Sequence, residues 1–189
     1  MASSYCAAIR EGKIHPVHTD YHDNEYGFPI QDDALLFERL ILEINQAGLS
    51  WETILKRKEG FREAYDSFDI ARVAEYGEED VARLLTDPRI IRNRLKVAAA
   101  VSNAQAVLRL QQEHGSFQAW LDLHHPRALG DWVKLFRANF RFTGGEIVNE
   151  FLMSTGYLPG AHDADCPVGI ALRAQSPPWM RSESEQSIS

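Results

Sequence analysis

One amphipathic stretch limits what this chain can fold into more than any other feature. Between residues 33 and 47, apolar side chains recur every three or four positions, as on the buried face of a helix: Leu36, Phe37, Leu40, Ile41 and Ile44. Asp32 and Asp33 offer N-cap side chains, and Gly48 is typical of a helix end. The pattern predicts a helix over about 33–47 with one face in the core.

An acidic residue, Glu43, lies on that same apolar face, because it follows Leu36 by seven positions and Leu40 by three. A carboxylate that leaves water is unfavourable unless a cation or hydrogen-bond donors meet it. Trp51 follows the helix end, and an acid beside an indole ring suits a flat, cationic ligand. In the alternative interpretation, Glu43 accepts hydrogen bonds from backbone N–H groups and Trp51 fills the core. The pattern alone leaves both open.

Whole-chain properties favour one soluble domain. A length of 189 residues suits a single core. No apolar run approaches the roughly 20 residues that cross a bilayer, and the first residues do not resemble a signal peptide, so we expect a cytoplasmic protein without a membrane partner. The net charge of −7 argues against broad nucleic-acid coating, although phosphate contacts need only a few well-placed cations.

The expected fold class is all-α. Residues 5–31 are rich in aromatic residues and histidine and show no helical period, which suggests a site more than packing. Further helices are expected from Ser50 to about 58 and over about 61–68, 69–76, 78–85, 94–113, 116–122, 131–138 and 145–155. We expect one helical domain over 1–172. A disordered tail is expected over 173–189, where Ser, Pro, Glu and Gln dominate.

Two of the expected helices are joined by a short basic connection. Pro88 disfavours a helical residue before it, so the chain must turn there. Positive charge gathers after this turn, at Arg89, Arg92, Arg94 and Lys96. Residues 78–113 are therefore a candidate helix–hairpin–helix, in which turn N–H groups and a helix N-terminus hold a DNA phosphate. A solvated turn with chance charges is the alternative.

A metal site is suggested by the pair His162 and Cys166, whose spacing lets one loop give two ligands to a tetrahedral ion. Cys6 and His22 could complete a closed Cys2His2 set, which favours a structural zinc ion joining the two ends of the domain. The alternative is two unrelated buried thiols and two surface histidines. Asp163 and Asp165 are rival ligands for an oxygen-preferring ion.

Several motifs in order resemble the DNA-3-methyladenine glycosylase I family over roughly residues 5–170. They are Tyr-His-Asp-Asn-Glu-Tyr-Gly (21–27), Leu-Glu-Ile-Asn-Gln-Ala-Gly-Leu-Ser-Trp (42–51), Phe-Asp (68–69), Ile-Ile-Arg-Asn-Arg (90–94), Phe-Thr-Gly (142–144) and His-x3-Cys (162–166). The resemblance implies a helix–hairpin–helix glycosylase fold and a monomer. It also implies hydrolysis of the N-glycosidic bond of 3-methyladenine in alkylated double-stranded DNA, which leaves an abasic site.

The resemblance also implies roles for individual residues. Glu43 and Tyr21 would hydrogen-bond the flipped base, Trp51 would stack on it, and Glu43 is the candidate catalytic group. Leu49 is our candidate wedge in the DNA stack. The expected DNA-contacting residues of the hairpin are Ile90, Arg92 and Arg94. The expected ligands of one structural zinc ion per chain are Cys6, His22, His162 and Cys166.

The chain departs from the family pattern at a few positions. Asn45 and Glu146 stand near the expected pocket, where they could change the range of bases accepted, and Leu95 stands in the hairpin where glycine is common. Tyr26 replaces a frequent tryptophan. Two other hypotheses stay open at this point: a non-catalytic or altered-specificity protein that binds alkylated DNA, and a helical protein that binds a small cation.

Overall fold

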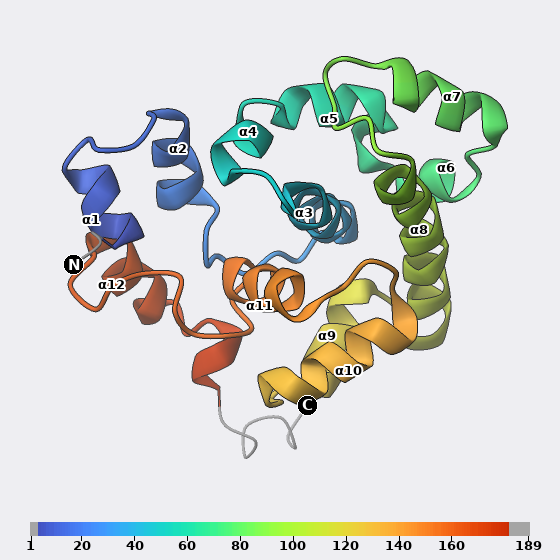
Figure 1. Ribbon diagram of the computed structural model, residues 1–189. Helices are drawn as coiled ribbons and strands as arrows, with labels where there is room; N and C mark the ends of the chain where they lie inside the picture. The colour runs from blue at the N-terminus through green and yellow to red at the C-terminus, as the bar shows by residue number, and fades with distance from the viewer. Residues whose placement is uncertain (1–3, 182–189) are drawn as a thin grey trace.

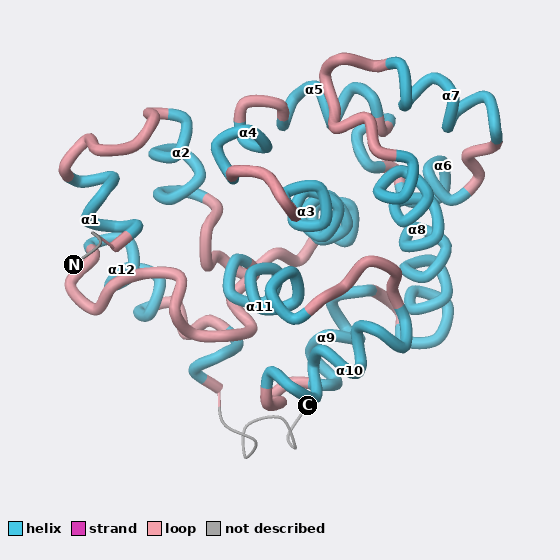
Figure 2. Tube along the Cα trace, viewed as in Figure 1, coloured by secondary structure: helices cyan, strands magenta, loops and turns pink. Residues whose placement is uncertain are grey.

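The structure is a computed structural model that describes residues 4–181, and every regular element in this range is helical (Figure 1). The elements are α1 (Tyr5–Arg10), α2 (Val17–Asn24), α3 (Asp33–Gln46), α4 (Trp51–Leu55), α5 (Lys58–Ala64), η1 (Asp66–Phe68), α6 (Ile70–Ala74), α7 (Glu78–Thr86), α8 (Arg94–His114), α9 (Phe117–His124), α10 (Leu129–Asn139), α11 (Gly145–Ser154), α12 (Pro167–Ala174) and η2 (Pro178–Met180). Figure 2 shows only helices and loops. None of the described helices is long and apolar enough to cross a membrane. The all-α expectation is confirmed.

Helix α3 is the centre of the packing. Figure 1 shows it end-on, with α4, α8 and α11 around it. Its apolar positions Leu36, Phe37, Leu40, Ile41 and Ile44 are all fully buried. The side chain of Asp32 caps the helix by accepting a hydrogen bond from the N–H of Leu35. The carboxylate of Asp33 instead connects α3 to α9, since it accepts hydrogen bonds from the N–H groups of Phe117 and Gln118 at the start of α9.

The N-terminal segment differs from its expectation. It contains two helices, α1 and α2, although the sequence shows no helical period there. The buried side chains of α2 are His18, Tyr21 and His22, which do recur at helical spacing. A scale that counts only apolar residues misses them, because this helix buries histidine and tyrosine toward a site instead of leucine toward a core.

Two boundaries also differ. The second predicted helix ends at Leu55, and Lys58 begins the separate helix α5. The chain beyond residue 172 stays ordered, because α12 runs to Ala174 and the 3-10 turn η2 packs Pro178 against the domain. Residues 173–181, where the expected tail was to begin, thus contain regular structure. Residues 182–189 lie outside the described residues.

Candidate functional site

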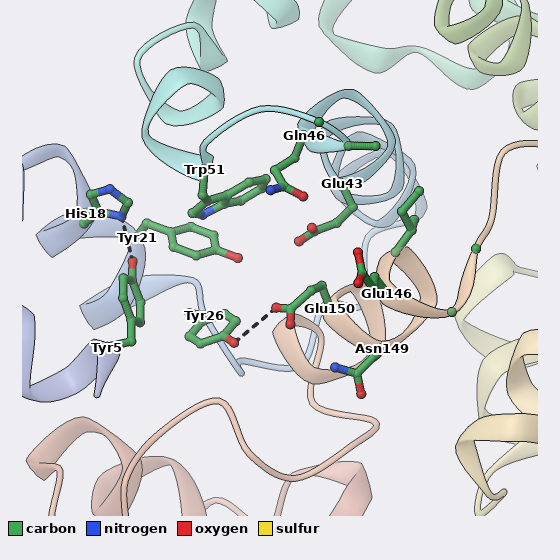
Figure 3. A pocket seen from close by; sticks show the side chains of 15 residues that line it. Tyr5, His18, Tyr21, Tyr26, Glu43, Gln46, Trp51, Glu146, Asn149 and Glu150 are labelled. Atoms are coloured by element: carbon green, nitrogen blue, oxygen red, sulfur yellow. Dashed lines mark hydrogen bonds between the residues drawn. The ribbon is translucent and has the colours of Figure 1, made fainter. Parts of the chain in front are cut away.

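A cavity of about 870 Å³ lies between the N-terminal helices, the C-terminal end of α3 and helix α11 (Figure 3). Its lining residues are Tyr5, His18, Tyr21, Tyr26, Glu43, Gln46, Ala47, Gly48, Trp51, Gly144, Gly145, Glu146, Ile147, Asn149 and Glu150. Polar and aromatic groups dominate this list, as expected for a site that orients a small, flat ligand. Three residues predicted to bind the base (Tyr21, Glu43 and Trp51) line this one cavity.

Glu43 is a buried polar group of the cavity. Its side chain is 4% exposed, yet it forms no hydrogen bond or ion pair with any of residues 4–181. The pKa of its carboxyl is raised to about 8, chiefly because burial disfavours the charged form. The positive charge of Arg39, one helical turn earlier, lowers this pKa, and the negative charge of Glu150 raises it further. The backbone N–H partners of the alternative interpretation are not found among residues 4–181. The carboxyl faces the cavity ready for a donor or a cation.

Arg39 is close to Glu43 but is engaged elsewhere. Its guanidinium donates to the backbone oxygen of Ser154 at 3.2 Å and to the carboxylate of Glu25 at 3.1 Å. It also donates to the hydroxyl oxygen of Tyr21 at 3.4 Å, and it lies 5.0 Å from the centre of that ring. Arg39 therefore holds Tyr21 in place, and its charge lowers the pKa of Glu43 without a direct hydrogen bond.

An aromatic wall stands beside the carboxyl. The rings of Tyr21 and Trp51 meet edge to face with centroids 5.2 Å apart, and Tyr21 and Tyr26 lie 5.5 Å apart. Burial raises the pKa of Tyr21 well above its usual value, so its hydroxyl is neutral and can donate. The indole nitrogen of Trp51 is buried without a partner among the described residues. Figure 3 shows these side chains converging on the same space as Glu43.

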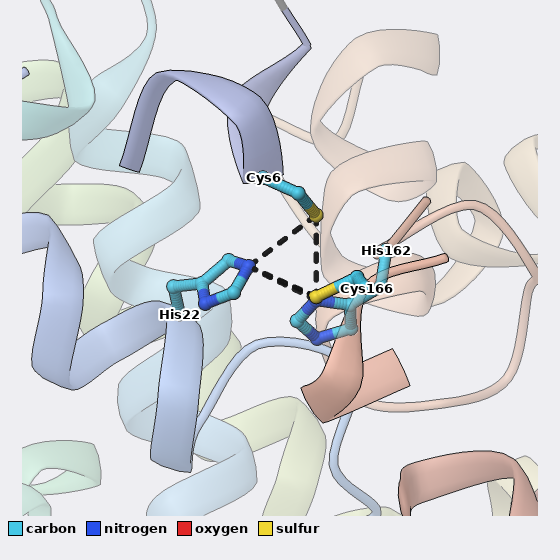
Figure 4. A group of neighbouring side chains, drawn as sticks. All are labelled: Cys6, His22, His162 and Cys166. Carbon is cyan, nitrogen blue, oxygen red and sulfur yellow. Dashed lines mark hydrogen bonds between the residues drawn. The ribbon is translucent and has the colours of Figure 1, made fainter. Parts of the chain in front are cut away.

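A second cluster unites the two ends of the domain (Figure 4). The candidate ligand atoms of Cys6, His22, His162 and Cys166 all lie within 4.8 Å of one another. Three of the four residues are buried and His162 is partly so. The Nε2 atom of His22 is 3.3 Å from the Sγ atom of Cys6 and 3.7 Å from that of Cys166. Four residues far apart in the sequence thus form one compact group.

The histidine rings of this cluster are oriented from outside. Nδ1 of His22 donates to the carboxylate of Asp23 at 2.6 Å, and Nε2 of His162 donates to the backbone oxygen of Tyr26 at 2.7 Å. These contacts leave the other ring nitrogen of each histidine facing the thiols. Partners of this kind commonly orient histidines that bind a metal. The rival carboxylates Asp163 and Asp165 do not belong to the four-residue cluster.

The basic residues of the connection between α7 and α8 have different roles. Arg89 pairs with Asp87 at 2.7 Å and also with Glu63, so its charge is neutralised within the protein. Lys96 is 6% exposed, and its ammonium group donates to the backbone oxygens of Asn45 and Ala47 at 2.8 Å each. Lys96 therefore caps the C-terminal end of α3 and does not face solvent.

Arg92 and Arg94 remain as exposed cations without an ion pair in the described part of the chain. The side chain of Asn93 caps α8 by accepting from the N–H groups of Leu95 and Lys96, so those two groups are not free for a phosphate. The side chain of Ile90 is only 2% exposed and belongs to the core. The DNA contact expected at Ile90 stays a prediction, and this burial leaves its backbone to make the contact.

The loop after α3 brings Leu49 to the surface, where it is 38% exposed. Gly48 allows the turn because its φ of +81° is rarely adopted by other residues, and Gln46 donates to the backbone oxygen of Leu49 at 2.8 Å. Asn45 does not line the cavity, since its amide is 1% exposed and bonds to the backbone of Ile41. The suggested influence of Asn45 on base choice would therefore have to be indirect, and it stays a prediction.

Sequence reasoning missed or misplaced several residues around the cavity. Arg39 shares a helix face with Glu43 four positions later, a spacing that was available in the sequence. Lys96 was counted with the hairpin cations, because nothing local distinguishes a lysine that caps another helix. Glu150 was not singled out at all, although it lines the cavity from α11.

Comparisons with known proteins agree on one family. The model of the methyladenine glycosylase family matches residues 11–128. A DNA-3-methyladenine glycosylase of Haemophilus influenzae is 34% identical over 170 residues, covering 80% of this chain and 91% of the relative. The match to DNA-3-methyladenine glycosylase 1 of Escherichia coli is 45% identical over 112 residues, covering 58% of this chain but only 60% of that relative.

Solved structures give the same result. The structure of 3-methyladenine DNA glycosylase I from Staphylococcus aureus, described as the basis of 3-methyladenine recognition, superposes with a TM-score of 0.78 at 35% identity, covering 89% of this chain and 97% of that one. A variant of 3-methyladenine DNA glycosylase I in complex with 3-methyladenine gives 0.77 at 34% identity, covering 84% and 95%. The similarity therefore extends over most of the helical architecture.

Proposed function

The chain belongs to the methyladenine glycosylase family, and we propose that it is a monofunctional DNA glycosylase that hydrolyses the N-glycosidic bond of 3-methyladenine in alkylated DNA. One observation carries the substrate assignment. Glu43 is a buried carboxyl without a partner among residues 4–181, at the wall of an aromatic cavity. The family resemblance drawn from the motifs is confirmed.

The chemistry of the lesion matches this cavity. Methylation at N3 makes adenine cationic within the DNA, so the base is a good leaving group without strong acid catalysis. Glu43 pairs with that charge, Trp51 offers a face for cation–π stacking, and the neutral hydroxyl of Tyr21 can donate to a ring nitrogen. Unmodified adenine is neutral and offers no positive charge that would favour the ionised form of Glu43, so it gains less from this cavity than the cationic base does.

DNA is proposed to bind across the α7–α8 connection. Arg92 and Arg94 supply cations that no acidic residue of the described chain neutralises, and they would contact phosphates. The base must leave the stack to reach the cavity, and a weakly paired, damaged base is easier to flip. Leu49, exposed in the loop next to the cavity, is proposed to fill the gap left in the duplex.

A structural zinc ion is proposed for the cluster of Cys6, His22, His162 and Cys166. Two thiols and two imidazoles are the donors that structural zinc prefers, and the four groups already converge with both histidines oriented. The ion would tie α1 and α2 to the chain before α12, and so fix Tyr21 and Tyr26 beside Glu43. Free thiols fit a reducing compartment, which supports the proposed cytoplasmic location.

Product analysis tests the function. Purified protein is incubated with N-methylated duplex DNA, released bases are separated by chromatography, and abasic sites are counted with an aldehyde-reactive probe. We expect free 3-methyladenine, one abasic site for each base released, and an uncut strand. Unmethylated duplex serves as the control and should release nothing. Binding to methylated duplex without any base release would refute the enzyme and favour a DNA-binding protein.

A further inference from the structure

A row of three charged side chains ends beside the cavity, with Glu25 at its middle. The Oε2 atom of Glu25 accepts a hydrogen bond from the guanidinium of Arg39 in α3 at 3.1 Å. Its Oε1 atom accepts one from the ammonium group of Lys58 in α5. The side chains of Arg39 and Lys58 are only 5% and 15% exposed. Glu25, at the end of α2, thus serves as the counter-ion of two largely buried cations.

Arg39 has a second carboxyl within reach, that of Glu43. The two residues are one helical turn apart on α3, a spacing at which opposite charges commonly pair, and both are almost fully buried. No ion pair or hydrogen bond joins them within residues 4–181. The guanidinium instead donates to Glu25, Tyr21 and the backbone oxygen of Ser154. Glu25 is the only carboxylate among these acceptors, so its charge draws the guanidinium away from Glu43.

Without the charge of Glu25, the guanidinium would be buried without a counter-ion, which is strongly unfavourable. Arg39 donates to the hydroxyl of Tyr21 at 3.4 Å, and Figure 3 shows that hydroxyl facing the carboxyl of Glu43. Glu150, on the other wall, already accepts a hydrogen bond from Tyr26. Glu43 is therefore the carboxyl to which a released Arg39 would turn. A Glu43 paired with Arg39 would no longer be open to a cationic base.

We propose that Glu25 is a positioning residue for base excision: by pairing with Arg39, it keeps the carboxyl of Glu43 open for the cationic base. This inference rests on the glycosylase function proposed above. Glu25 does not line the cavity, so it acts only through Arg39. Lys58 holds the other oxygen of Glu25 and so orients the carboxylate toward Arg39. It follows that Glu25 matters for base release only while Arg39 is present.

A double-mutant cycle tests this dependence. Wild type, Glu25→Gln, Arg39→Met and the double variant are each incubated in excess over methylated duplex DNA, and release of 3-methyladenine is followed over time. Duplex affinity and melting temperature are measured in parallel. Glutamine keeps the shape of Glu25 without its charge, and methionine replaces the apolar stem of Arg39. Glu79 is an exposed residue of α7 outside the cavity, so Glu79→Gln removes the same charge as a matched control.

We expect Glu25→Gln to release 3-methyladenine at least about tenfold more slowly than wild type while binding the duplex about as well, because Arg39 then occupies Glu43. The double variant should release the base faster than Glu25→Gln and at about the rate of Arg39→Met, since no guanidinium remains to pair with Glu43. Glu79→Gln should release the base at the wild-type rate.

Release by Glu25→Gln at the wild-type rate would overturn this inference alone. A double variant no faster than Glu25→Gln would also overturn it, because Glu25 would then support the fold independently of Arg39. If Glu25→Gln unfolds too readily to assay, the other two variants decide: equal rates support the inference, and a double variant about tenfold slower than Arg39→Met overturns it. Release of no base by wild type would refute the proposed function itself, and this inference with it.

Discussion

Glu43 is expected to lower the stability of the fold wherever it is ionised, so that Glu43→Gln is more stable than wild type at alkaline pH. Burial raises the pKa of this carboxyl from an ordinary value of 4.5 to about 8 in the folded protein. Between these two values the folded state holds a proton that the unfolded state has lost. The free energy of unfolding must therefore fall as the pH rises through this window.

The size of the effect follows from the pKa difference. Each pKa unit corresponds to 1.36 kcal/mol, so the shift from 4.5 to about 8 makes the ionisation of Glu43 remove about 5 kcal/mol of stability. In a chain of this length, 1 kcal/mol shifts the melting temperature by about 2–4 °C. The melting temperature of Glu43→Gln should therefore be close to that of wild type near about pH 5 and exceed it by about 10–20 °C near about pH 9.

Thermal melts followed by circular dichroism from pH 5 to 9 measure this difference directly. Glu79→Gln is the control, because its exposed carboxyl should give no difference that depends on pH. The reasoning would be refuted by a constant gap between Glu43→Gln and wild type at every pH, or by a less stable variant at pH 9. The predicted difference at alkaline pH is the stability that the protein loses by keeping an unpartnered carboxyl in its site.

Three further predictions concern the DNA contact, the end of α3 and the metal cluster. Arg92→Ala and Arg94→Ala should each lower the slope of log affinity for DNA against log salt concentration by about one unit, with unchanged melting temperatures. An unchanged slope in filter binding would exclude the two arginines as phosphate contacts. Lys96→Met should slow base release at least about tenfold and change duplex affinity little, because the pocket residues at the end of α3 lose their anchor; unchanged single-turnover rates would contradict this. Cys166→Ser should reduce bound zinc from about one ion per chain to almost none and lower the melting temperature. Emission spectrometry that finds no zinc in fresh, reduced wild type would refute the metal proposal.

The sequence predicted the parts of the fold that follow from local periodicity. Helix α3 was predicted to within a residue, because the burial pattern of Leu36, Leu40 and Ile44 has a single helical solution. The convergence of Cys6, His22, His162 and Cys166 was predicted from the chemistry of the ligands and the family motifs. Helix α2 was missed, since its buried face is made of histidine and tyrosine.

What the sequence left undecided depends on tertiary partners. Lys96 and Arg92 look alike in the chain, yet one caps a distant helix and the other stays free, and only the packing of α8 against α3 separates them. Ile90 lies in a motif that the family resemblance links to DNA, but its side chain completes the core. Whether Glu43 was satisfied by the backbone depended on which groups its helix faces across the cavity.

The central claim is that the unpartnered carboxyl of Glu43 recognises a cationic base, and single-turnover release of 3-methyladenine tests it most directly. Wild type and Glu43→Gln are compared in excess over methylated duplex near neutral pH, with duplex affinity measured in parallel. The account predicts that Glu43→Gln releases the base at least about a hundredfold more slowly while binding the duplex about as well. Equal rates of release for the two proteins would contradict it.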